Sequence, residues 1–489
     1  MTEYSDKNCA QEAGLSQTRF SQTQINRSSS LSTEHAADLI PNELLHILKT
    51  EKQEHIVDHL TNLLVEAQAK LIDRLTRINW QEFHQIYQAP ELSKVEAAQV
   101  ISLEQRLVNN TVIETAGITA YAQGEVAVLL VAGGEGSRLG LNGPKGCFPF
   151  GPISQDSIYQ KHAEKVLAIS NKTDRDVPFV LMTSPSTHEA TIQFFSENNF
   201  FGLNPNQVRF FQQDTVPTTD VDGKLLLKAP GQLLENPNGH GGSIDGLISS
   251  GTLDWLNKQG IKDLVYLQVD NILAPAYDPY AIGLRRQNNS DLINKVIKKI
   301  SPEEKVGALV RVDSKDTIIE YSDLTPAQKL MKVNDETFLF GWGNVAAHVV
   351  SIDFITKLQS EHYTLPFHQA IKDIQAWNGA ARVSTSGIKR ERFFFDILAL
   401  GNNVGLEISR EQEFAPLKNS TGTDSIETSR ALASAEYTRW LNACGVDIAK
   451  DSLVEIRPKF AATLEELKAK IDSDPSILNL CKNKEEILL

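Results

Sequence analysis

Apolar residues begin to recur at regular steps near Pro41, where the composition of the chain changes. Residues 1–34 hold seven Ser, four Thr and four Gln, and too few large apolar side chains to offset the entropy lost on ordering. We therefore predict a disordered tail over residues 1–40. Beyond it, apolar positions follow one another at three- and four-residue steps, which places an apolar stripe along a long helix. The stripe is formed by Ile56, Leu60, Leu63, Leu64, Ala67, Leu71, Leu75 and Ile78.

The hydrophobic pattern divides the chain after this tail into three predicted parts. The stripe predicts a helical N-terminal subdomain over residues 41–115, whose apolar face most often covers the core of the same chain. A dimerising coiled coil is the alternative. Residues 116–400 are predicted to form the catalytic domain. After Gly401 the pattern becomes mixed, so we predict a small C-terminal lobe over residues 401–489.

From Glu125 onward, short continuous apolar runs alternate with amphipathic stretches. This alternation is typical of an α/β fold, in which a mostly parallel, Rossmann-like sheet carries helices on its faces. Ligands of such sheets bind beyond the carboxyl ends of the strands, so the loops after the apolar runs are the candidate site. The predicted strands cover residues 126–131, 179–182, 208–211 and 264–269, and the predicted helices cover residues 157–169, 188–195, 244–257 and 278–285.

Charge and cysteine usage narrow the function classes. The chain has 489 residues with 48 Lys and Arg against 62 Asp and Glu, a net charge of −14, which argues against general binding to nucleic acids or anionic membranes. A polyphosphate substrate would need a local cluster of cations. Cys9, Cys147, Cys444 and Cys481 form no CxxC pair, so no zinc or disulfide framework is expected. Without a leader-like or membrane-spanning apolar run, we expect a cytoplasmic protein.

The first loop of the predicted sheet has the composition of a phosphate-binding loop. It follows the run 126–131 and reads AGGEGSRLGLNGPKG over residues 132–146. Glycines such as Gly133, Gly134 and Gly136 let backbone N–H groups approach phosphate oxygens without side-chain obstruction. Arg138 and Lys145 add the positive charge that glycine lacks. An ordinary βα turn would not need glycine at this density together with two cations.

Two common nucleotide-binding motifs do not fit this loop. A dinucleotide fingerprint requires GxGxxG, whereas the spacing from Gly134 is GxGxxxG, and the second strand is not followed by a ribose-binding acid. A Walker loop requires Gly-Lys followed by Ser or Thr, whereas Lys145 lies between Pro144 and Gly146. An NAD oxidoreductase and a P-loop NTPase are therefore disfavoured.

The loop and seven later motifs resemble those of one known family. AGGxGxRLGxxxPKG is similar to the signature of the eukaryotic-type UDP-N-acetylhexosamine pyrophosphorylases, members of the wider UTP:sugar-1-phosphate uridylyltransferase family. The resemblance runs from about residue 50 into the C-terminal lobe. The later motifs are FFQQ at 210–213, PNGHGG at 237–242, VDN at 269–271, EYS at 320–322, GNVAAH at 343–348, GIKRE at 387–391 and PLKN at 416–419.

The resemblance implies a nucleotide-diphospho-sugar transferase core that joins UTP to a sugar 1-phosphate. Such a reaction needs positioned cations more than covalent chemistry, because pyrophosphate departs with growing negative charge. Because of their charge and by the resemblance, Arg138 and Lys145 are the candidates to stabilise the departing pyrophosphate. The resemblance alone assigns Lys418 to the sugar-linked phosphate.

A carboxylate at the end of a predicted strand is the candidate metal ligand. Asp270 closes the run DLVYLQVD over residues 263–270. Magnesium prefers one or two carboxylates plus substrate phosphate oxygens, so Asp270 is predicted to bind Mg²⁺. The alternative is an Asp that caps the next turn.

The remaining motifs are predicted to hold the base and the sugar. Gln213 and the amide of Gly239 would contact the uracil edge, and His240 would have a positioning role without acid or base chemistry. By resemblance, Asn271, Glu320 and Asn344 would contact the sugar. Together with the glycines of the phosphate loop, the substrate-binding candidates are Gly133, Gly134, Gly136, Gln213, Gly239, His240, Asn271, Glu320 and Asn344.

Three departures from the family pattern bear on the choice of sugar. His240 stands where the hexosamine enzymes usually carry Asn, Ser243-Ile244 replaces a commoner Leu-Tyr, and Gly341-Trp342 replaces Asn-Ala. The hexosamine-type motifs outweigh these departures, so N-acetylglucosamine 1-phosphate is the expected substrate. The alternatives are the same chemistry on glucose or galactose 1-phosphate, and a UDP-sugar-binding protein without activity.

Overall fold

The computed structural model describes residues 40–108, 110–335, 337–481 and 484–489, so the predicted disordered tail lies outside the described residues apart from Ile40. The chain divides into two compact units, one formed by Met1–Arg77 with Pro230–Gln232 and one formed by Ile78–Ala229 with Leu233–Leu489. The predicted boundaries at residues 115 and 400 stay predictions. No described helix is long and apolar enough to cross a lipid bilayer.

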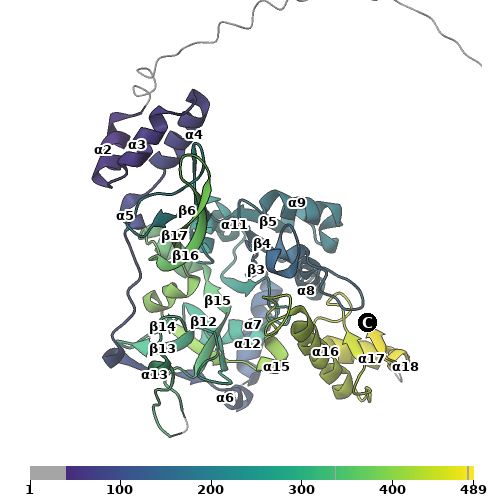
Figure 1. Cartoon of the computed structure of the whole chain (residues 1–489). Helices are drawn as coiled ribbons and strands as arrows, with labels where there is room; N and C mark the ends of the chain where they lie inside the picture. The colour runs from purple at the N-terminus through teal and green to yellow at the C-terminus, as the bar shows by residue number, and fades with distance from the viewer. Residues whose placement is uncertain (1–39, 109, 336, 482–483) are drawn as a thin grey trace, which may run out of the picture. The chain divides into compact units, whose positions relative to one another are not determined.

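The first unit contains helices α2 (Asn42–Thr50), α3 (Glu54–Thr61) and α4 (Val65–Thr76), drawn in purple in Figure 1. Two helices share the apolar stripe for which one long helix was predicted, because the chain turns at residues 62–64 and leaves Leu64 84% exposed. The periodic spacing survives the turn since all three helices direct apolar residues into the same small core. These residues are Leu44, Leu48, Ile56, Leu60, Leu71 and Leu75.

The second unit is built on a large sheet whose central path of eight strands is mostly parallel. The exception along this path is β15, which lies antiparallel between β11 and β12. The α/β class with a mostly parallel sheet is therefore confirmed. In spatial order the strands are β2 (Val100–Ile101), β18 (Asn403–Glu407), β12 (Leu292–Lys298), β15 (Trp342–Ser351), β11 (Asp263–Gln268), β3 (Val126–Val131), β4 (Phe179–Thr183) and β5 (Val208–Gln212).

Other strands extend or accompany this sheet. The strands β1 (Val95–Ala97), β13 (Ala308–Val312) and β14 (Lys315–Ile319) widen it beside β15. A separate sheet contains β7 (Thr219–Asp220), β17 (Arg382–Glu391), β16 (His368–Trp377) and β8 (Leu227–Ala229). Two small pairs are β6 (Thr215–Pro217) with β10 (Glu235–Pro237), and β19 (Leu453–Glu455) with β20 (Glu486–Leu488).

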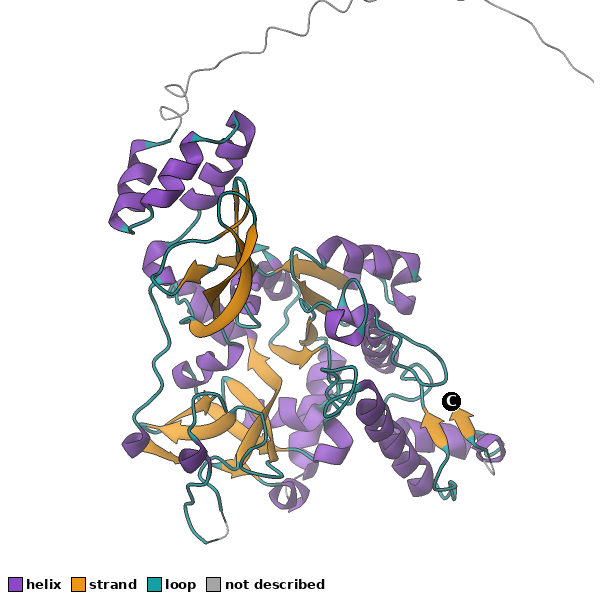
Figure 2. Cartoon of the chain, viewed as in Figure 1, coloured by secondary structure: helices purple, strands orange, loops and turns teal. Residues whose placement is uncertain are grey.

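Alternate residues of β3 face two different cores, which is why this strand reads as a continuous apolar run. Val126, Val128 and Leu130 pack with α7 (Asn110–Gln123), α8 (Ile158–Thr173), α12 (Pro279–Gln287) and α16 (Ile426–Ala443). The odd-numbered positions, such as Leu129, pack with α10 (Gly242–Ser249), α11 (Thr252–Lys258) and α14 (Ile352–Ser360). Helices thus cover both faces of the sheet, as the purple ribbons around the orange strands of Figure 2 show.

Local signals explain where several helices begin and end. The Ser157 hydroxyl caps α8 by accepting from the Gln160 amide at 3.1 Å, and Asp278 caps α12 by accepting from the Ala281 amide at 3.0 Å. The helix predicted over residues 244–257 is two helices, because Gly251 adopts a φ of +69° between α10 and α11. The remaining helices are α5 (Trp80–Phe83), α6 (Leu103–Val108), α9 (His188–Glu197), α13 (Pro326–Lys329), α15 (Arg410–Glu413), α17 (Leu464–Ser473) and α18 (Ile477–Cys481).

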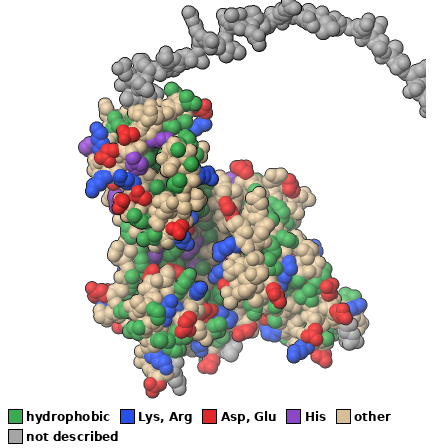
Figure 3. Space-filling view, viewed as in Figure 1, with side chains coloured by type: hydrophobic (Ala, Val, Ile, Leu, Met, Phe, Trp, Pro, Cys, Tyr) green, Lys and Arg blue, Asp and Glu red, His purple; other side chains and the backbone are tan. Residues whose placement is uncertain are grey.

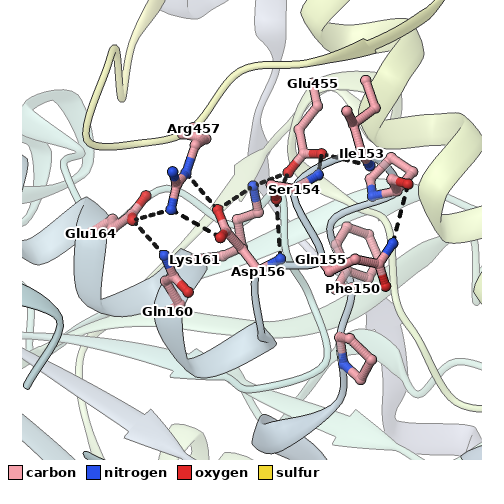
Figure 4. A network of polar contacts seen from close by, with 12 residues as sticks. Phe150, Ile153, Ser154, Gln155, Asp156, Gln160, Lys161, Glu164, Glu455 and Arg457 are labelled. Atoms are coloured by element: carbon pink, nitrogen blue, oxygen red, sulfur yellow. Dashed lines mark hydrogen bonds and ion pairs between the residues drawn. The ribbon is translucent and has the colours of Figure 1, made fainter. Parts of the chain in front are cut away.

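The C-terminal part is joined to α8 by a buried network of charges (Figure 4). Lys161 pairs with Glu455, and its Nζ lies 3.5 Å from Asp156. Arg457 pairs with Asp156 at 2.6 Å and lies 3.4 Å from Glu164. Because a buried charge without a partner is strongly unfavourable, these five groups fix the C-terminal strand β19 against the first helix after the glycine loop.

Helices α7 and α12 approach each other so closely that each needs a glycine at the contact. A Cβ atom on Gly283 would lie 1.8 Å from the carbonyl oxygen of Ile113, and one on Gly117 would lie 1.8 Å from that of Pro279. The backbones must separate to admit even one methyl group.

We therefore expect Gly283→Ala to destabilise the second unit. Overpacking costs about 1–3 kcal/mol, which exceeds the gain of about 1 kcal/mol in helix propensity. The midpoint of thermal unfolding should fall, whereas the control Gln287→Ala, on the exposed end of the same helix, should leave it nearly unchanged. A higher midpoint for Gly283→Ala would show that the helices are not in backbone contact.

Candidate active site

The glycine loop closes on itself after β3. Glu135 forms an isolated antiparallel bridge with Pro144, the Gly136 amide donates to the Gly143 carbonyl at 2.8 Å, and the Lys145 amide donates to the Gly134 carbonyl at 3.0 Å. The loop therefore has a defined shape without a ligand, and Gly134 stays exposed on it. This geometry suits the predicted role of a phosphate cradle.

Lys145 is the point at which three distant segments meet. It begins the short 3₁₀ helix η3 (Lys145–Cys147), and its Nζ atom donates to the Leu417 carbonyl at 3.3 Å and lies 3.8 Å from Asp270 Oδ2. The Leu417 amide in turn donates to the Asp270 carbonyl at 3.0 Å. The structure thus brings Lys145, Asp270 and the segment of Lys418 together, although 272 positions separate Lys145 from Leu417.

Arg138 and Lys418 belong to the two loops that meet at Lys145, but no ion pair joins either side chain to Asp270 among the described residues. Arg138 is exposed on η2 (Ser137–Leu139) within the glycine loop. The Lys418 amide donates to the Asp424 carbonyl at 2.7 Å, and the Lys418 Nζ atom lies 3.5 Å from the Asp424 carboxylate. Both side chains are partly or fully exposed and long, so they can turn towards an anion without any change in the backbone.

Asn271 holds the segment that precedes Lys418. Its Nδ2 atom donates to the Glu413 carbonyl at 2.8 Å, and its Oδ1 atom accepts from the Ala415 amide at 3.0 Å. The side chain is buried, and residue 271 also forms a backbone bridge with Pro416. The sequence predicted a sugar contact for Asn271, and the structure adds a second role, which is to fasten the loop 413–416 beside Asp270.

Gln213 lies against Gly133 with an unsatisfied acceptor. Its backbone amide donates to the Thr183 carbonyl at 2.8 Å, and a Cβ atom on Gly133 would lie 2.3 Å from Gln213 Nε2. Within the described part of the chain, Gln213 Oε1 is buried and has no hydrogen-bond partner. Buried polar atoms are normally paired, so the free Gln213 Oε1 atom is compatible with the predicted uracil contact, which stays a prediction.

The loop of Gly239 and His240 is held by the backbone of an aromatic segment. Gly239 has a φ of +81°, and a Cβ atom there would lie 2.5 Å from the Arg392 carbonyl oxygen. His240 Nδ1 accepts from the Phe394 amide at 3.1 Å, and the ring stacks on Phe393 at 5.2 Å. Burial, and then repulsion from His368, lower the pKa of His240 to about 4, so this residue is neutral near pH 7 and acts as an acceptor.

Glu320 and Asn344 meet across Gly307. The Asn344 amide donates to the Gly307 carbonyl at 2.8 Å, and a Cβ atom on Gly307 would lie 2.8 Å from Glu320 Oε1. Burial, and then the nearby Asp323 carboxylate, raise the pKa of Glu320. Since β15 runs antiparallel to β11, its early residue Asn344 lies at the edge where β11 ends, two residues before Asp270. This is the edge expected for ligands.

Sequence reasoning missed the role of the segment that follows GIKRE. Arg392 is buried and pairs with Asp245 and Glu82, each at 2.7 Å. The Gly241 amide donates to the Arg392 carbonyl at 2.8 Å. This segment therefore anchors the predicted uracil loop, and the run of three aromatic residues directly after Arg392 was the signal that could have indicated a buried, structured role.

The described residues contain no group of three or more His, Cys, Asp and Glu that could hold a metal ion by themselves. Asp270 is a single carboxylate at the carboxyl edge of the sheet. One carboxylate fits a cation whose other ligands are substrate phosphate oxygens and water, which is the usual arrangement for Mg²⁺ with nucleotides. The residues present are thus compatible with magnesium.

A glycine loop, a lysine held between two distant segments and a neighbouring carboxylate at the carboxyl edge of a mostly parallel sheet are the parts expected of a nucleotidyltransferase. Residues 78–484 match the family described as UTP--glucose-1-phosphate uridylyltransferase. The chain belongs to this family, which confirms the resemblance drawn from its motifs.

Relatives and solved structures within the family refine this similarity. The chain is 35% identical to the UDP-N-acetylglucosamine pyrophosphorylase of Saccharomyces cerevisiae over 72% of this chain and 77% of that protein. It is 35% identical to UDP-N-acetylglucosamine diphosphorylase 2 of Arabidopsis thaliana over 67% of this chain and 68% of that protein. A crystal structure of the uridine diphosphate N-acetylglucosamine pyrophosphorylase from Trypanosoma brucei superposes with a TM-score of 0.79 and 25% identity, covering 94% of this chain and 99% of that one.

We expect Gly133→Ala to weaken UTP binding at least tenfold while the protein stays folded. The added methyl would displace only the end of the flexible Gln213 side chain, so stability should change little, but the carboxamide would leave its position. Calorimetric titration with UTP measures the effect. Ser137→Ala, on the same loop with an exposed side chain, is the control. Unchanged UTP affinity in Gly133→Ala would exclude Gln213 from the nucleotide site.

Proposed function

We propose that the protein makes UDP-N-acetylglucosamine and pyrophosphate from UTP and N-acetyl-α-D-glucosamine 1-phosphate. The observation that carries this proposal is the convergence of Lys145, Asp270 and the loop of Lys418 beside the glycine loop. Relatives that are at least 30% identical over two thirds of this chain are named for this reaction. Acidic and basic side chains are interspersed over the face drawn in Figure 3, so the charge needed for a polyanionic substrate must come from this local cluster.

The reaction balances without a covalent enzyme intermediate. A phosphate oxygen of the sugar 1-phosphate attacks the α-phosphorus of UTP, the bond from that phosphorus to the bridging oxygen breaks, and the electron pair leaves with pyrophosphate. Lys145 and Arg138 would offset the charge that develops on the leaving group, and Lys418 would orient the attacking phosphate. Lys145 is already held beside Asp270 and the Leu417 carbonyl, and such a preorganised cation is effective because the charge moves during the reaction while the cation stays in place.

The unsatisfied Gln213 oxygen supports uracil as the base, since the N3–H of uracil is a donor that cytosine lacks. The His240 position is also compatible with the hexosamine enzymes, which usually carry Asn there. The His240 Nδ1 atom accepts a hydrogen bond from the Phe394 amide, and an Asn side-chain oxygen at the same position could accept that bond. The departure at residue 240 therefore does not by itself indicate another sugar.

Glu320 and Asn344 are proposed to select the sugar. A carboxylate and an amide that pair with sugar hydroxyl and acetamido groups would be left unpaired by a wrong analogue. The solved UDP-glucose pyrophosphorylases share the fold at 16–17% identity with this chain, so that comparison supports the architecture and not the substrate. Glucose and galactose 1-phosphate remain the alternative substrates.

The proposed substrates are tested by pyrophosphate release across a panel of sugar 1-phosphates and nucleoside triphosphates. We expect kcat/KM to be highest for UTP with N-acetylglucosamine 1-phosphate, and CTP to fail because cytosine presents an acceptor to Gln213. Glu320→Ala is expected to reduce kcat/KM for all sugars, with UTP binding retained. Faster turnover of glucose 1-phosphate would assign the protein to the alternative, and no release with any pair would refute the activity.

We also propose that Mg²⁺ supports the reaction, bound by Asp270 together with substrate phosphate oxygens. Chelation with EDTA should abolish turnover, and added magnesium should restore it. Asp270→Asn should raise the magnesium concentration needed for half-maximal rate, because a neutral amide is a poorer ligand for a hard cation. Turnover that persists in EDTA, or a magnesium requirement unchanged in Asp270→Asn, would remove the metal from the account.

A further inference from the structure

A cavity of about 610 Å³ lies among the elements gathered around α16 in Figure 1. Its walls come from α7, α8, α15, α16, the segment 272–280 and the C-terminal segment 456–465. None of the residues predicted for the nucleotide or the sugar lines it. The volume falls in the range of small-molecule sites. We call it the C-lobe cavity.

The C-lobe cavity has an aromatic lining that suits a flat or apolar ligand. Tyr277, Tyr280 and Trp440 contribute to its wall. The Arg106 guanidinium lies 4.7 Å from the centre of the Tyr280 ring, and Lys172 Nζ lies 4.9 Å from that of Tyr277. Two rings are thus held in place by cations, as in a preformed site.

The cations around the cavity are paired with carboxylates, with one exception. Lys165 on α8 donates to the carbonyl oxygens of Ile272 and Ala274, and among the described residues it has no carboxylate partner. An ammonium group has three donors, so one remains for a ligand. The paired cations are Arg106 with Glu413 at 3.7 Å, Lys172 with Glu466 at 3.4 Å and Arg439 with Glu436 at 2.7 Å.

The charge of Lys165 is disfavoured by its surroundings. Burial, and then repulsion from Lys161 and Lys295, lower its pKa to about 7. A nearby anion would supply both the missing acceptor and the missing countercharge. Lys165 is half-buried and lines the aromatic cavity without a carboxylate partner among the described residues, an arrangement that suits the binding of an anion.

We propose that the C-lobe cavity binds a small organic anion with an aromatic or apolar body, whose anionic group accepts a hydrogen bond from the Lys165 ammonium. The body would lie against Tyr277 and Trp440, which are partly exposed. Carboxylate, sulfonate and phosphate-monoester groups share the required chemistry.

Two backbone segments connect the wall of the cavity to the candidate active site, so a bound ligand can affect that site. Lys165 holds Ile272 and Ala274, which directly follow Asp270 and Asn271 in the chain. Glu413, also part of the wall, offers its carbonyl to Asn271 Nδ2. A ligand bound to the third donor of Lys165 shares the ammonium with these two carbonyl oxygens and weakens its hold on them, so it lowers the turnover of the proposed reaction. This second half of the inference rests on the proposed function, whereas the binding itself does not.

The probe for the test is anilinonaphthalenesulfonate, a fluorescent aromatic sulfonate, titrated into the folded full-length protein without substrates. We expect one saturable site with energy transfer from tryptophan, and less transfer in Trp440→Phe. Lys165→Met should weaken the affinity at least about tenfold, the loss expected for one charge-assisted hydrogen bond. The control Lys258→Met, at an exposed lysine on α11, should bind as the wild type does.

A second variant keeps the proposal testable if Lys165→Met does not fold. Ala462→Trp adds bulk to the C-terminal wall of the cavity without touching Lys165, and it should also abolish saturable binding. Unsaturable fluorescence in the wild type, or wild-type affinity in the folded variants, would overturn the assignment of the cavity.

The rate of turnover tests separately whether a ligand in the cavity affects the candidate active site. Saturating probe should lower kcat for pyrophosphate release without changing the KM for UTP, because the cavity shares no lining residue with the nucleotide site. Saturable binding with unchanged kcat would overturn the coupling. An inactive protein that still binds the probe through Lys165 would refute the proposed function and leave the cavity site standing.

Discussion

One ammonium group, that of Lys145, ties the glycine loop to the two other segments from which the candidate phosphate site is built. It contacts the Leu417 carbonyl and lies 3.8 Å from the Asp270 carboxylate. The three segments come from the loop after β3, the end of β11 and the C-terminal part of the chain. Without this convergence the protein, at a net charge of −14, would have no local field to attract a triphosphate. The glycine loop alone supplies shape and backbone donors, but not the position of the distant loop.

The C-terminal helix α16 fixes the two loops that must meet at Lys145. The Ser429 hydroxyl donates to the Pro416 carbonyl at 2.6 Å, which lies in the segment of Lys418. Arg430, the next residue, donates to the carbonyls of Pro149 and Phe150 at 2.7 and 2.8 Å, just after the Lys145 helix. The charge network around Lys161 and Glu455 in Figure 4 adds a second attachment. The C-terminal part therefore positions both loops of the candidate site.

Patterns along the chain predicted what depends on neighbours in sequence. The run 126–131 matches β3 because both faces of this strand are buried, and Ser157 and Asp278 lie at the starts of α8 and α12 because capping is local. The stripe from Ile56 to Ile78 predicted one helix where the chain forms two, since apolar spacing reports which residues reach a core and not whether the backbone turns between them. The motifs singled out Lys145, Asp270 and Lys418, but their contacts could not be predicted. The hydrogen bond from Asn271 to the Glu413 carbonyl could not be predicted either, because it joins residues 142 positions apart.

A double-mutant cycle between Lys145 and Ser429 tests the phosphate site around Lys145 most directly. The measured quantity is the single-turnover rate of pyrophosphate release. Ser429 touches the Pro416 carbonyl and not Lys145, so any coupling must pass through the shared loop. We expect Lys145→Ala to lower the rate by about 10² to 10³, the usual effect of removing one preorganised charge-stabilising donor, and Ser429→Ala to lower it less. In the Lys145→Ala background, Ser429→Ala should have almost no further effect. Fully additive effects would contradict a phosphate site assembled around the Lys145 ammonium.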